Sequence, residues 1–226
     1  MIGSPYKIAG IYAVNEWIVT NHSIVTQKNI PIFETTHAEM QRISSLTTPS
    51  PLLAVIEIPA CNASAFSTRV KGLGLELALD DIRDPGNMGT IIRIADWFGI
   101  SVIWCSENCV DIYNPKVVQA TMGSIARVEV VYGNLKEILK EFKKSGDGQV
   151  YGAYLEGDSI YNDELIKPGI VVIGNESRGI SQELEPFVTR KIFIPSYGGA
   201  AGSKAESLNA SVATAIICAE FRRKMK

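Results

Sequence analysis

The strongest constraint on this fold is a regular alternation of short apolar runs and helical patterns over residues 75–221. Six runs are predicted strands: LELAL (75–79), SVIWC (101–105), RVEVVY (127–132), VYGAYLE (150–156), IVVIG (170–174) and KIFIP (191–195). Such nearly continuous apolar runs are typical of strands buried on both faces of a sheet. Helical patterns separate most of them, so the sequence predicts an α/β fold, a mostly parallel sheet with helices on both faces.

A small α/β unit precedes this region. Residues 60–74 (ACNASAFSTRVKGLG) are small, polar and glycine-bearing, a composition typical of a linker. Before them, KIAGIYAV and LLAVIEIP predict strands, and THAEMQRISSL predicts a helix capped by Thr35 or Thr36. We therefore predict two domains, 1–70 and 71–226, the first beginning abruptly in a strand as if part of a larger domain were absent.

The last helical pattern, SLNASVATAIICAEFRRK, predicts a long helix. Its apolar face is predicted to comprise Leu208, Val212, Ala215, Ile216 and Ala219. The sequence ends in FRRKMK, the one local excess of positive charge, and cations are favourable at the negative pole of a helix dipole.

Composition indicates a globular protein rather than a disordered one, with 46% hydrophobic and 20% charged residues. No apolar run reaches eighteen residues and the N-terminus lacks the pattern of a secretory signal, so we expect a cytoplasmic protein. The four cysteines are then predicted to be small core residues. Cys105 and Cys109 have a C-x3-C spacing, but no second cysteine pair follows and the chain has two histidines, so no metal site is predicted.

The net charge of −2 and the pI near 5.8 argue mildly against a nucleic-acid-binding protein. Neutralisation of phosphates is the main source of affinity in that class, and a basic surface is its usual mark. The charge balance alone therefore gives no support to an RNA partner.

Ligands of open parallel sheets bind beyond the carboxyl ends of the strands, which makes the loops at 80–90, 174–181 and 195–207 the candidate site. In the first loop, Asp84-Pro85-Gly86 predicts a turn and Asn87 a helix cap. Arg93 follows early in the helix, where the dipole disfavours a cation, so we expect an anionic or electron-rich partner to compensate it.

The second loop, GNESRGIS, contains two glycines that permit positive φ, and polar side chains fill the space between them. Those side chains lie where a cofactor is expected, although Ser177 or Ser181 starting a short helix is the simpler alternative. The third loop, PSYGGAAGSKAESLNAS, is glycine-rich but lacks the spacing of a Walker A loop, and no GxGxxG motif is present. Three such loops at strand ends favour a binding site.

Three segments resemble, in order and spacing, the signature motifs of the SpoU (TrmH) branch of the SPOUT methyltransferases, which methylate RNA at the ribose 2′-hydroxyl. They are DPGNMGTIIRIADWFG (84–99), VVIGNESRGIS (171–181) and IFIPSYGGAAGSKAESLNASVATAIICAEF (192–221), hereafter the first, second and third motifs. The likeness spans about residues 75–221. The first seventy residues resemble more weakly the substrate-RNA-binding domain that many members carry, and they are shorter than that domain.

The resemblance implies a C-terminal trefoil knot, which nothing in the periodicity shows. It also implies S-adenosylmethionine as cofactor, tRNA or rRNA as substrate, and a homodimer formed through the knot region and the final helix. No metal is implied. The residues that it places in the cofactor pocket are Leu155, Gly174, Ile194 and Leu208.

Transfer to a ribose hydroxyl, a weak nucleophile, requires in-line positioning and a route for the hydroxyl proton. The residues that the resemblance makes catalytic are Arg93, Asn87, Glu176, Ser207 and Asn209. Because a guanidinium stays protonated, we expect Arg93 to orient the hydroxyl and the adjacent phosphate while a phosphate oxygen or water accepts the proton. Glu176 is expected to hold Arg93 or the motif loops, and Ser207 and Asn209 to cap the final helix and contact the ribose or phosphate.

Three alternatives remain at this point. A SPOUT enzyme that methylates a base nitrogen is opposed by the SLN motif and by the pair Asn87 and Arg93. A catalytically inactive RNA-binding or ribosome-assembly protein is favoured slightly by the acidic pI and the short first unit, but opposed by the intact motif residues. An unrelated nucleotide-binding α/β protein is opposed by the missing Walker and Rossmann motifs. No residue identifies the RNA or the nucleotide.

Overall fold

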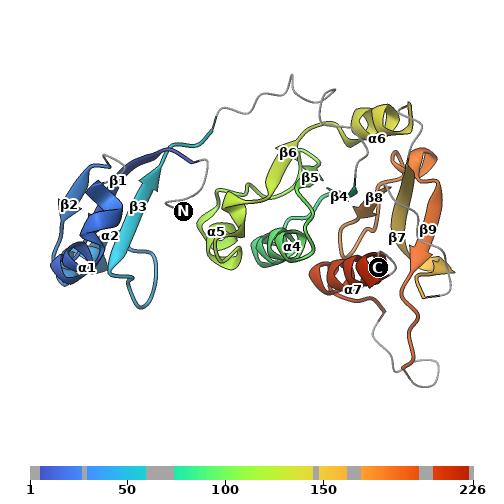
Figure 1. Ribbon diagram of the computed structural model, residues 1–226. Coiled ribbons are helices and arrows are strands. Elements are labelled where there is room, and N and C mark those ends of the chain that lie inside the picture. The colour runs from blue at the N-terminus through green and yellow to red at the C-terminus, as the bar shows by residue number, and fades with distance from the viewer. Residues whose placement is uncertain are drawn as a thin grey trace. The chain divides into compact units, whose positions relative to one another are not determined.

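The computed structural model describes residues 6–26, 30–59, 74–144, 148–161, 169–198 and 206–223 (Figure 1). The chain divides into two compact units, Met1–Ala60 and Cys61–Lys226. Each unit has its own sheet, and each is described by itself below.

The first unit is a three-stranded sheet with the strand order β2-β1-β3. Its strands are β1 (Ile8–Ala13), β2 (Ile32–Glu34) and β3 (Leu52–Ile56), and its helices are α1 (Asn15–Thr26) and α2 (His37–Ile43). Strand β1 pairs parallel to β2 and antiparallel to β3. Both predicted strands are present. Helix α1 and strand β2 are not predicted by the sequence pattern, because α1 has no clear apolar stripe and β2 is only three residues long.

Helix α2 is present where its sequence predicts it, and Thr36 rather than Thr35 is its cap. The Thr36 hydroxyl accepts a hydrogen bond from the Glu39 backbone N–H at 3.2 Å, and the Glu39 carboxylate accepts from the Thr36 N–H at 2.8 Å. This reciprocal capping box satisfies two amide groups at the start of the helix. The same bond from the Thr36 backbone is the main reason that the pKa of Glu39 is lowered.

The second unit contains a six-stranded sheet with the order β6-β5-β4-β8-β7-β9. The strands are β4 (Leu75–Leu79), β5 (Val102–Cys105), β6 (Glu129–Tyr132), β7 (Gln149–Ser159), β8 (Gly169–Ile173) and β9 (Arg190–Phe193). All the neighbouring pairs are parallel, so the six predicted strands and the predicted parallel sheet are confirmed. After β4 the sheet is extended on one side by β5 and then β6. Strand β8, which comes later in the chain, pairs with β4 on its other side. This reversal places a topological switch point between β4 and β8.

Helices cover both faces of this sheet, as predicted (Figure 1). On one face α4 (Pro85–Trp97), α5 (Pro115–Ala120) and α7 (Ala210–Arg223) pack against Leu75, Leu77 and Leu79. On the other face α6 (Leu135–Lys144) and the 3₁₀ turn η3 (Glu185–Phe187) pack near Ala78 and Trp104. A further 3₁₀ turn, η2 (Ser124–Ala126), follows α5. Because side chains alternate along a strand, successive residues of β4 supply two separate cores.

The predicted apolar face of α7 is wrong. The helix begins at Ala210, so Leu208 lies outside it, and Val212 is 46% exposed. The side chains that it buries lie on the opposite face: Ala210, Ser211, Thr214, Ile217, Cys218, Glu220 and Phe221. The sequence is apolar almost all round this helix, and periodicity cannot then choose which face meets the sheet. Among the described residues, Val212 and Ala219 stay exposed on the side of α7 away from the core, while Ile216 packs partly against it.

The basic C-terminal segment has a specific role at its first arginine. Arg222 donates from Nε to the Phe98 carbonyl at 2.6 Å and from Nη2 to the Gly99 carbonyl at 3.0 Å. These bonds close the carboxyl end of α4, whose last carbonyls have no partner within the helix. Lys224 and Lys226 lie outside the described residues.

The trefoil knot stays a prediction, because residues 162–168 and 199–205 lie outside the described part of the chain. Within the described part, no helix is both long enough and apolar enough to cross a membrane.

Candidate active site

The first motif begins the helix α4, and Asp84 rather than Asn87 caps it. The Asp84 carboxylate accepts a hydrogen bond from the Asn87 backbone N–H at 2.7 Å, and Pro85 occupies the first helical position. A carboxylate at the positive end of the helix dipole and a proline at that position are both favourable. The predicted Asn87 cap is therefore wrong, and the correction leaves the Asn87 side chain available for other contacts.

The side-chain amide of Asn87 joins the three motifs. Its Nδ2 donates to Oε1 of Glu176 in the second motif. Its Oδ1 accepts from Nδ2 of Asn209 in the third motif at 2.8 Å. A primary amide carries both a donor and an acceptor, which a carboxylate or a hydrocarbon side chain does not. Three predicted site residues thus meet through one side chain.

Asn209 is held at its other end by helix α7. Its Oδ1 accepts from the Ser211 N–H at 3.0 Å, the Ser211 hydroxyl at 2.6 Å and the Val212 N–H at 3.3 Å. The structure thus makes Asn209 the N-cap of this helix. Ser207 is exposed and makes no hydrogen bond to any described residue, so the structure gives it no capping role.

Arg93 lies on α4 with its side chain exposed, off the stripe that buries Ile91 and Ala95. Among the described residues, no acceptor lies within hydrogen-bonding or ion-pairing distance of its guanidinium. Of the two roles expected for Glu176, holding Arg93 or holding the motif loops, its contact with Asn87 corresponds to the second. The Arg93 guanidinium is left free to bind an external anion.

The second motif is a tight turn that displays Glu176. Asn175 N–H donates to the Gly179 carbonyl at 3.1 Å, and Gly179 N–H donates back at 2.8 Å. A Cβ atom on Gly174 would lie only 2.3 Å from the Gly179 backbone carbon, so a side chain there would overlap the turn. The alternative expectation, a helix starting at Ser177 or Ser181, is wrong, since residues 175–179 form this turn and Ser181 begins no helix. Close backbone approach therefore explains why glycine occupies position 174.

Three of the four predicted cofactor residues lie at adjacent strands of the sheet. Gly174 and Ile194 directly follow β8 and β9. Leu155 lies within β7, in the irregular stretch between Ala153 and Asp158, both of which pair with Ile192. Strands β8, β7 and β9 are neighbours, so the three residues lie toward the carboxyl edge of the sheet.

The exposure of these residues fits a group with an apolar ring. Leu155 is 74% exposed and Leu208 is 45% exposed, and Ile194 packs only partly against the core. An adenine ring requires apolar walls beside backbone donors and acceptors, which an edge of exposed aliphatic side chains and glycine backbone provides. Residues 199–205 of the third motif lie outside the described residues.

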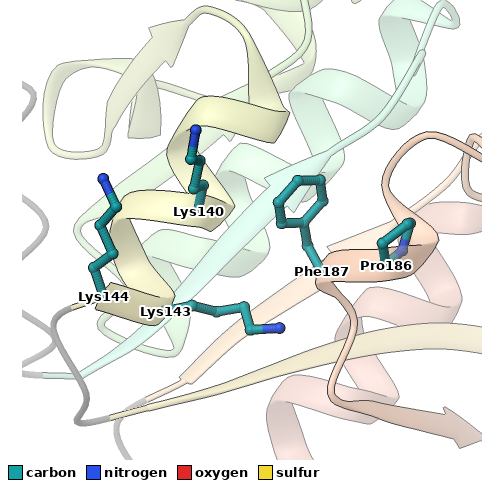
Figure 2. A pocket seen from close by; sticks show the side chains of 5 residues that line it. All are labelled: Lys140, Lys143, Lys144, Pro186 and Phe187. Atoms are coloured by element: carbon teal, nitrogen blue, oxygen red, sulfur yellow. The ribbon is translucent and has the colours of Figure 1, made fainter.

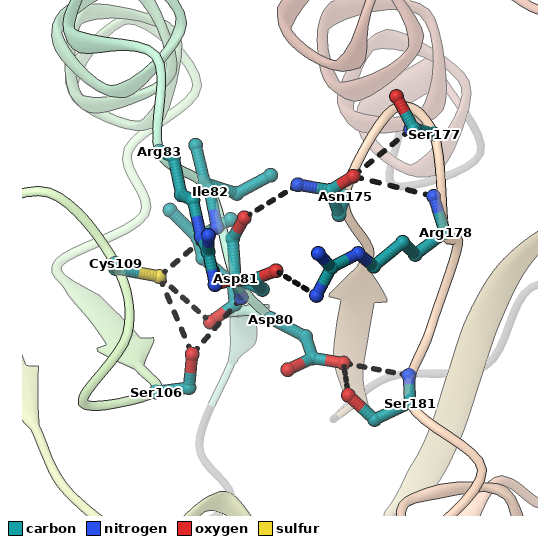
Figure 3. A network of polar contacts seen from close by, with 11 residues as sticks. Asp80, Asp81, Ile82, Arg83, Ser106, Cys109, Asn175, Ser177, Arg178 and Ser181 are labelled. Atoms are coloured by element: carbon teal, nitrogen blue, oxygen red, sulfur yellow. Dashed lines mark hydrogen bonds and ion pairs between the residues drawn. The ribbon is translucent and has the colours of Figure 1, made fainter.

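A second polar network ties the first loop to the second (Figure 3). The Asn175 side-chain amide donates to the Asp81 carbonyl at 2.9 Å, and Arg178 lies 3.8 Å from the Asp81 carboxylate. Ser181 donates to Asp80 from both its N–H and its hydroxyl, at 2.7 and 2.6 Å. Neither Asp80 nor Asp81 is among the site residues predicted from the sequence. The available signal was two adjacent carboxylates directly after a strand buried on both faces.

Cys109 lies next to the polar network of Asp80 and Asp81. Its sulfur accepts from the Ile82 N–H at 3.3 Å and lies 3.6 Å from the Ser106 hydroxyl (Figure 3). Its pKa is lowered to about 7, mainly by a hydrogen bond from Cys105, while burial opposes the shift. Cys105, Cys109 and Cys218 are all buried, as predicted for core residues, and Cys61 lies outside the described residues.

Two hollows of the described surface lie away from the three motifs. One of about 310 Å³ lies between α6 and η3, with lysine side chains on the α6 side and Phe187 on the η3 side (Figure 2). It is lined by Lys140, Lys143, Lys144, Pro186 and Phe187. Another of about 250 Å³ lies in the first unit, beside α2 and β3. Neither includes a predicted site residue, so the candidate site rests on the convergence of the motif loops.

Curated relatives of this chain are named as RNA methyltransferases. The 23S rRNA (guanosine(2553)-2′-O)-methyltransferase RlmP of Bacillus subtilis is 30% identical over 181 residues, which are 80% of this chain and 68% of the relative. The 23S rRNA (guanosine-2′-O-)-methyltransferase RlmB of Blochmanniella floridana is 32% identical, covering 89% of this chain and 80% of the relative. Several other relatives are longer, and the chain spans about half to two thirds of their length.

Solved structures show the same fold. A protein assigned to the TrmH family of RNA methyltransferases, from Porphyromonas gingivalis, superposes with a TM-score of 0.83 at 39% identity, over 97% of this chain and 84% of that one. The AdoMet-bound rRNA methyltransferase of Sinorhizobium meliloti superposes with a TM-score of 0.83 at 25% identity, over 100% of this chain and 82% of that one. The predicted fold class is confirmed.

The sequence model of the SpoU rRNA Methylase family matches residues 74–219, which include most of each motif and the whole parallel sheet. The resemblance carried by the three motifs is thereby confirmed, and this chain belongs to the SpoU rRNA methylase family.

Proposed function

We propose that this protein is an S-adenosylmethionine-dependent RNA methyltransferase that modifies a ribose 2′-hydroxyl. The observation that carries the proposal is the bridge from Glu176 through Asn87 to Asn209, because it brings residues of all three motifs to one point. The named relatives that are 2′-O-methyltransferases support the same reaction.

The reaction asks the chain to orient a hydroxyl and to keep the transfer in line. Arg93 binds the phosphate beside the target ribose and orients its 2′-hydroxyl, because a guanidinium is a permanent cation with several donors. The hydroxyl proton passes to a phosphate oxygen or to water. The three motif loops are held together by the side chains of Glu176, Asn87 and Asn209. Ser207, which is exposed, contacts the ribose or phosphate. S-adenosylmethionine supplies an activated sulfonium methyl group when it is bound.

The cofactor residues are assigned by the same proposal. Leu155, Ile194 and Leu208 provide aliphatic contacts for the adenine ring, and Gly174 provides close backbone approach. The support is that the side chains of Leu155 and Leu208 are both exposed, which leaves them available for contact with a ligand. The AdoMet-bound Sinorhizobium meliloti structure shares this fold.

A homodimer is the proposed assembly. On the side of α7 away from the core, Val212 and Ala219 are exposed and Ala215 is partly exposed, and this side would be buried if two copies packed through this helix. An exposed apolar stripe on a helix is characteristic of an interaction surface. The predicted partition into a substrate-RNA-binding domain (1–70) and a methyltransferase domain (71–226) stays a prediction, as does a cytoplasmic location.

Ribosomal RNA is the proposed substrate class among the two expected, because the relatives named above act on 23S rRNA. The test is transfer of a labelled methyl group to total RNA, followed by mapping of 2′-O-methylation in a strain lacking the gene and in its parent. One 2′-O-methylated nucleotide missing from the rRNA of the mutant supports the proposal. A missing base methylation supports the base-methylating alternative, and RNA binding without methyl transfer supports an inactive RNA-binding protein.

A further inference from the structure

The carboxylate of Asp80 is buried at the seam between two motif loops. Asp80 directly follows β4 and is 5% exposed. Its Oδ2 accepts two hydrogen bonds from Ser181, one from the N–H at 2.7 Å and one from the hydroxyl at 2.6 Å (Figure 3). Ser181 closes the second motif loop, 101 positions further along the chain.

In this arrangement, the free energy of burying the Asp80 carboxylate depends on the position of the second motif loop. Burying a carboxylate is unfavourable unless donors replace the water that it loses. In the described part of the chain, the hydrogen bonds that the Asp80 side chain accepts come from Ser181. If the loop moves away, the carboxylate keeps its burial but loses its donors, so the seated position of the loop is favoured.

The opposite end of the loop is anchored on the next residue. Asn175 donates to the Asp81 carbonyl at 2.9 Å. Asp81 has a φ of +58°, an uncommon left-handed conformation that aspartate tolerates better than most residues. Arg83 holds the Asp81 carboxylate at 2.6 Å. Residues 80 and 81 therefore fix both ends of the loop.

Glu176 lies between these two anchors in the sequence. Its carboxylate accepts from Asn87, whose own segment starts a few residues after Asp81. The distance between Glu176 and Asn87 is consequently set by how the second loop sits on residues 80 and 81. We propose that Asp80 is a positioning residue of the methyl transfer: by holding Ser181 it places the Glu176 carboxylate against Asn87. This inference rests on the proposed function, and nothing in it requires Asp80 to touch substrate or cofactor.

The test compares two variants, Ser181→Ala and Asp80→Asn, with the control Asp111→Asn. The Asp111 carboxylate is exposed and accepts a local hydrogen bond from the Tyr113 N–H. Each of the first two variants should lower kcat about 10-fold, the typical effect of losing a charge-assisted hydrogen bond, with little change in KM for RNA. Ser181→Thr keeps the hydroxyl and should restore most of kcat. Asp111→Asn should match the wild type.

A double-mutant cycle separates positioning from general destabilisation. In a Glu176→Ala background, Asp80→Asn should reduce kcat less than 2-fold, because the side chain that it positions is already gone. A loss that stays about 10-fold in that background overturns the inference, as does a wild-type kcat in both single variants.

Hydrogen exchange provides a readout that does not depend on activity. Ser181→Ala should increase amide exchange over residues 174–181 and, through Asn87 and Asn209, at the start of α7. Unchanged exchange in both segments contradicts the inference. A wild-type protein that transfers no methyl group contradicts the proposed function instead, and the exchange experiment then still decides whether Asp80 positions the loop.

Discussion

The side chain of Asn209 reaches that of Asn87 across 122 positions of sequence, with 2.8 Å between Nδ2 and Oδ1. The two residues lie at the starts of α7 and α4, so the contact joins two helix N-termini at one edge of the sheet. Because Asn87 also donates to Glu176, its amide nitrogen must face the carboxylate and its oxygen must face Asn209. This fixed orientation leads to the first prediction.

Asn87→Asp keeps the size of the side chain but replaces the donor that faces Glu176 with a second carboxylate. We expect kcat/KM to fall about 10–100-fold at neutral pH, because a hydrogen bond to a charged group is lost and two like charges are brought together. Activity should recover partly as the pH is lowered, since one carboxyl of the pair then carries a proton that it can donate. Methyl-transfer rates measured between pH 5 and 8 check this.

The matched control is Asn134→Asp at the start of α6. There the side-chain oxygen accepts from the Lys136 N–H at 3.0 Å, and aspartate caps a helix as well as asparagine does. This variant should keep the wild-type rate and pH profile. A pH profile of Asn87→Asp that parallels the wild type would exclude the proposed pairing with Glu176.

Arg93→Ala should abolish methyl transfer while leaving affinity for S-adenosylmethionine nearly unchanged. The guanidinium has no partner among the described residues, so its removal disturbs no contact with any of them, whereas loss of substrate orientation costs about 100-fold or more in rate. Calorimetry measures the cofactor affinity, and transfer of a tritiated methyl group measures activity. Lys116→Ala, an exposed cation of the same unit, is the control. Equal loss of binding and transfer would show that Arg93 is structural.

Gly174→Ala should destabilise the protein and weaken cofactor binding. The added methyl group would lie 2.3–2.4 Å from backbone atoms of Gly179 and Ile180, which cannot move as a flexible side chain can. Overpacking of this kind costs about 1–3 kcal/mol. For a chain of this size each kcal/mol lowers the melting temperature by about 2–4 °C.

Gly74→Ala is the control for this prediction, because among the described residues no atom beyond the chain neighbours lies within 4 Å of the Cβ that it would introduce. Thermal unfolding of both variants gives the comparison. If Gly174→Ala and Gly74→Ala have the same melting temperature, the close approach of the turn to position 174 is not required for stability.

Glu76 gives a prediction about pH. Burial raises the pKa of its carboxyl above the ordinary value of 4.5, and the hydrogen bond from Trp104 Nε1 opposes that shift. The folded state therefore holds this proton to a higher pH than the unfolded state does. The contribution of Glu76 to stability is full below pH 4.5 and is lost as the pH rises through the folded-state pKa, at about 1.4 kcal/mol for each unit of difference.

Glu76→Gln removes this titration, so the free energy of unfolding should fall less steeply from pH 4 to pH 8 than in the wild type. Urea unfolding over that range measures the difference. Glu107→Gln, at an exposed carboxylate, should leave the slope unchanged. Parallel curves for Glu76→Gln and the wild type would contradict a raised pKa.

Residue type and spacing within short windows of sequence predicted the helix cap of the first unit and the strands of the second. The cap at Thr36 and the six strands of the second unit follow from residue type and spacing over short windows. The face of α7 did not, because both sides of that helix are apolar and only packing against the sheet selects one. The cap of α4 moved from Asn87 to Asp84 because two good capping residues lie close together, and the proline at position 85 fixes which of them precedes the helix.

The sequence by itself determined the parallel sheet, the loops that follow its strands and the three motifs, since each of these is written in contiguous residues. Only the tertiary structure decided which residues of the motifs and strand-end loops touch: Glu176 binds Asn87, Asn87 binds Asn209, and Asp80 binds Ser181. Those partners are 89 to 122 positions apart. Hydrogen bonds over such separations depend on the order in which the strands assemble, and no short window of sequence contains that order.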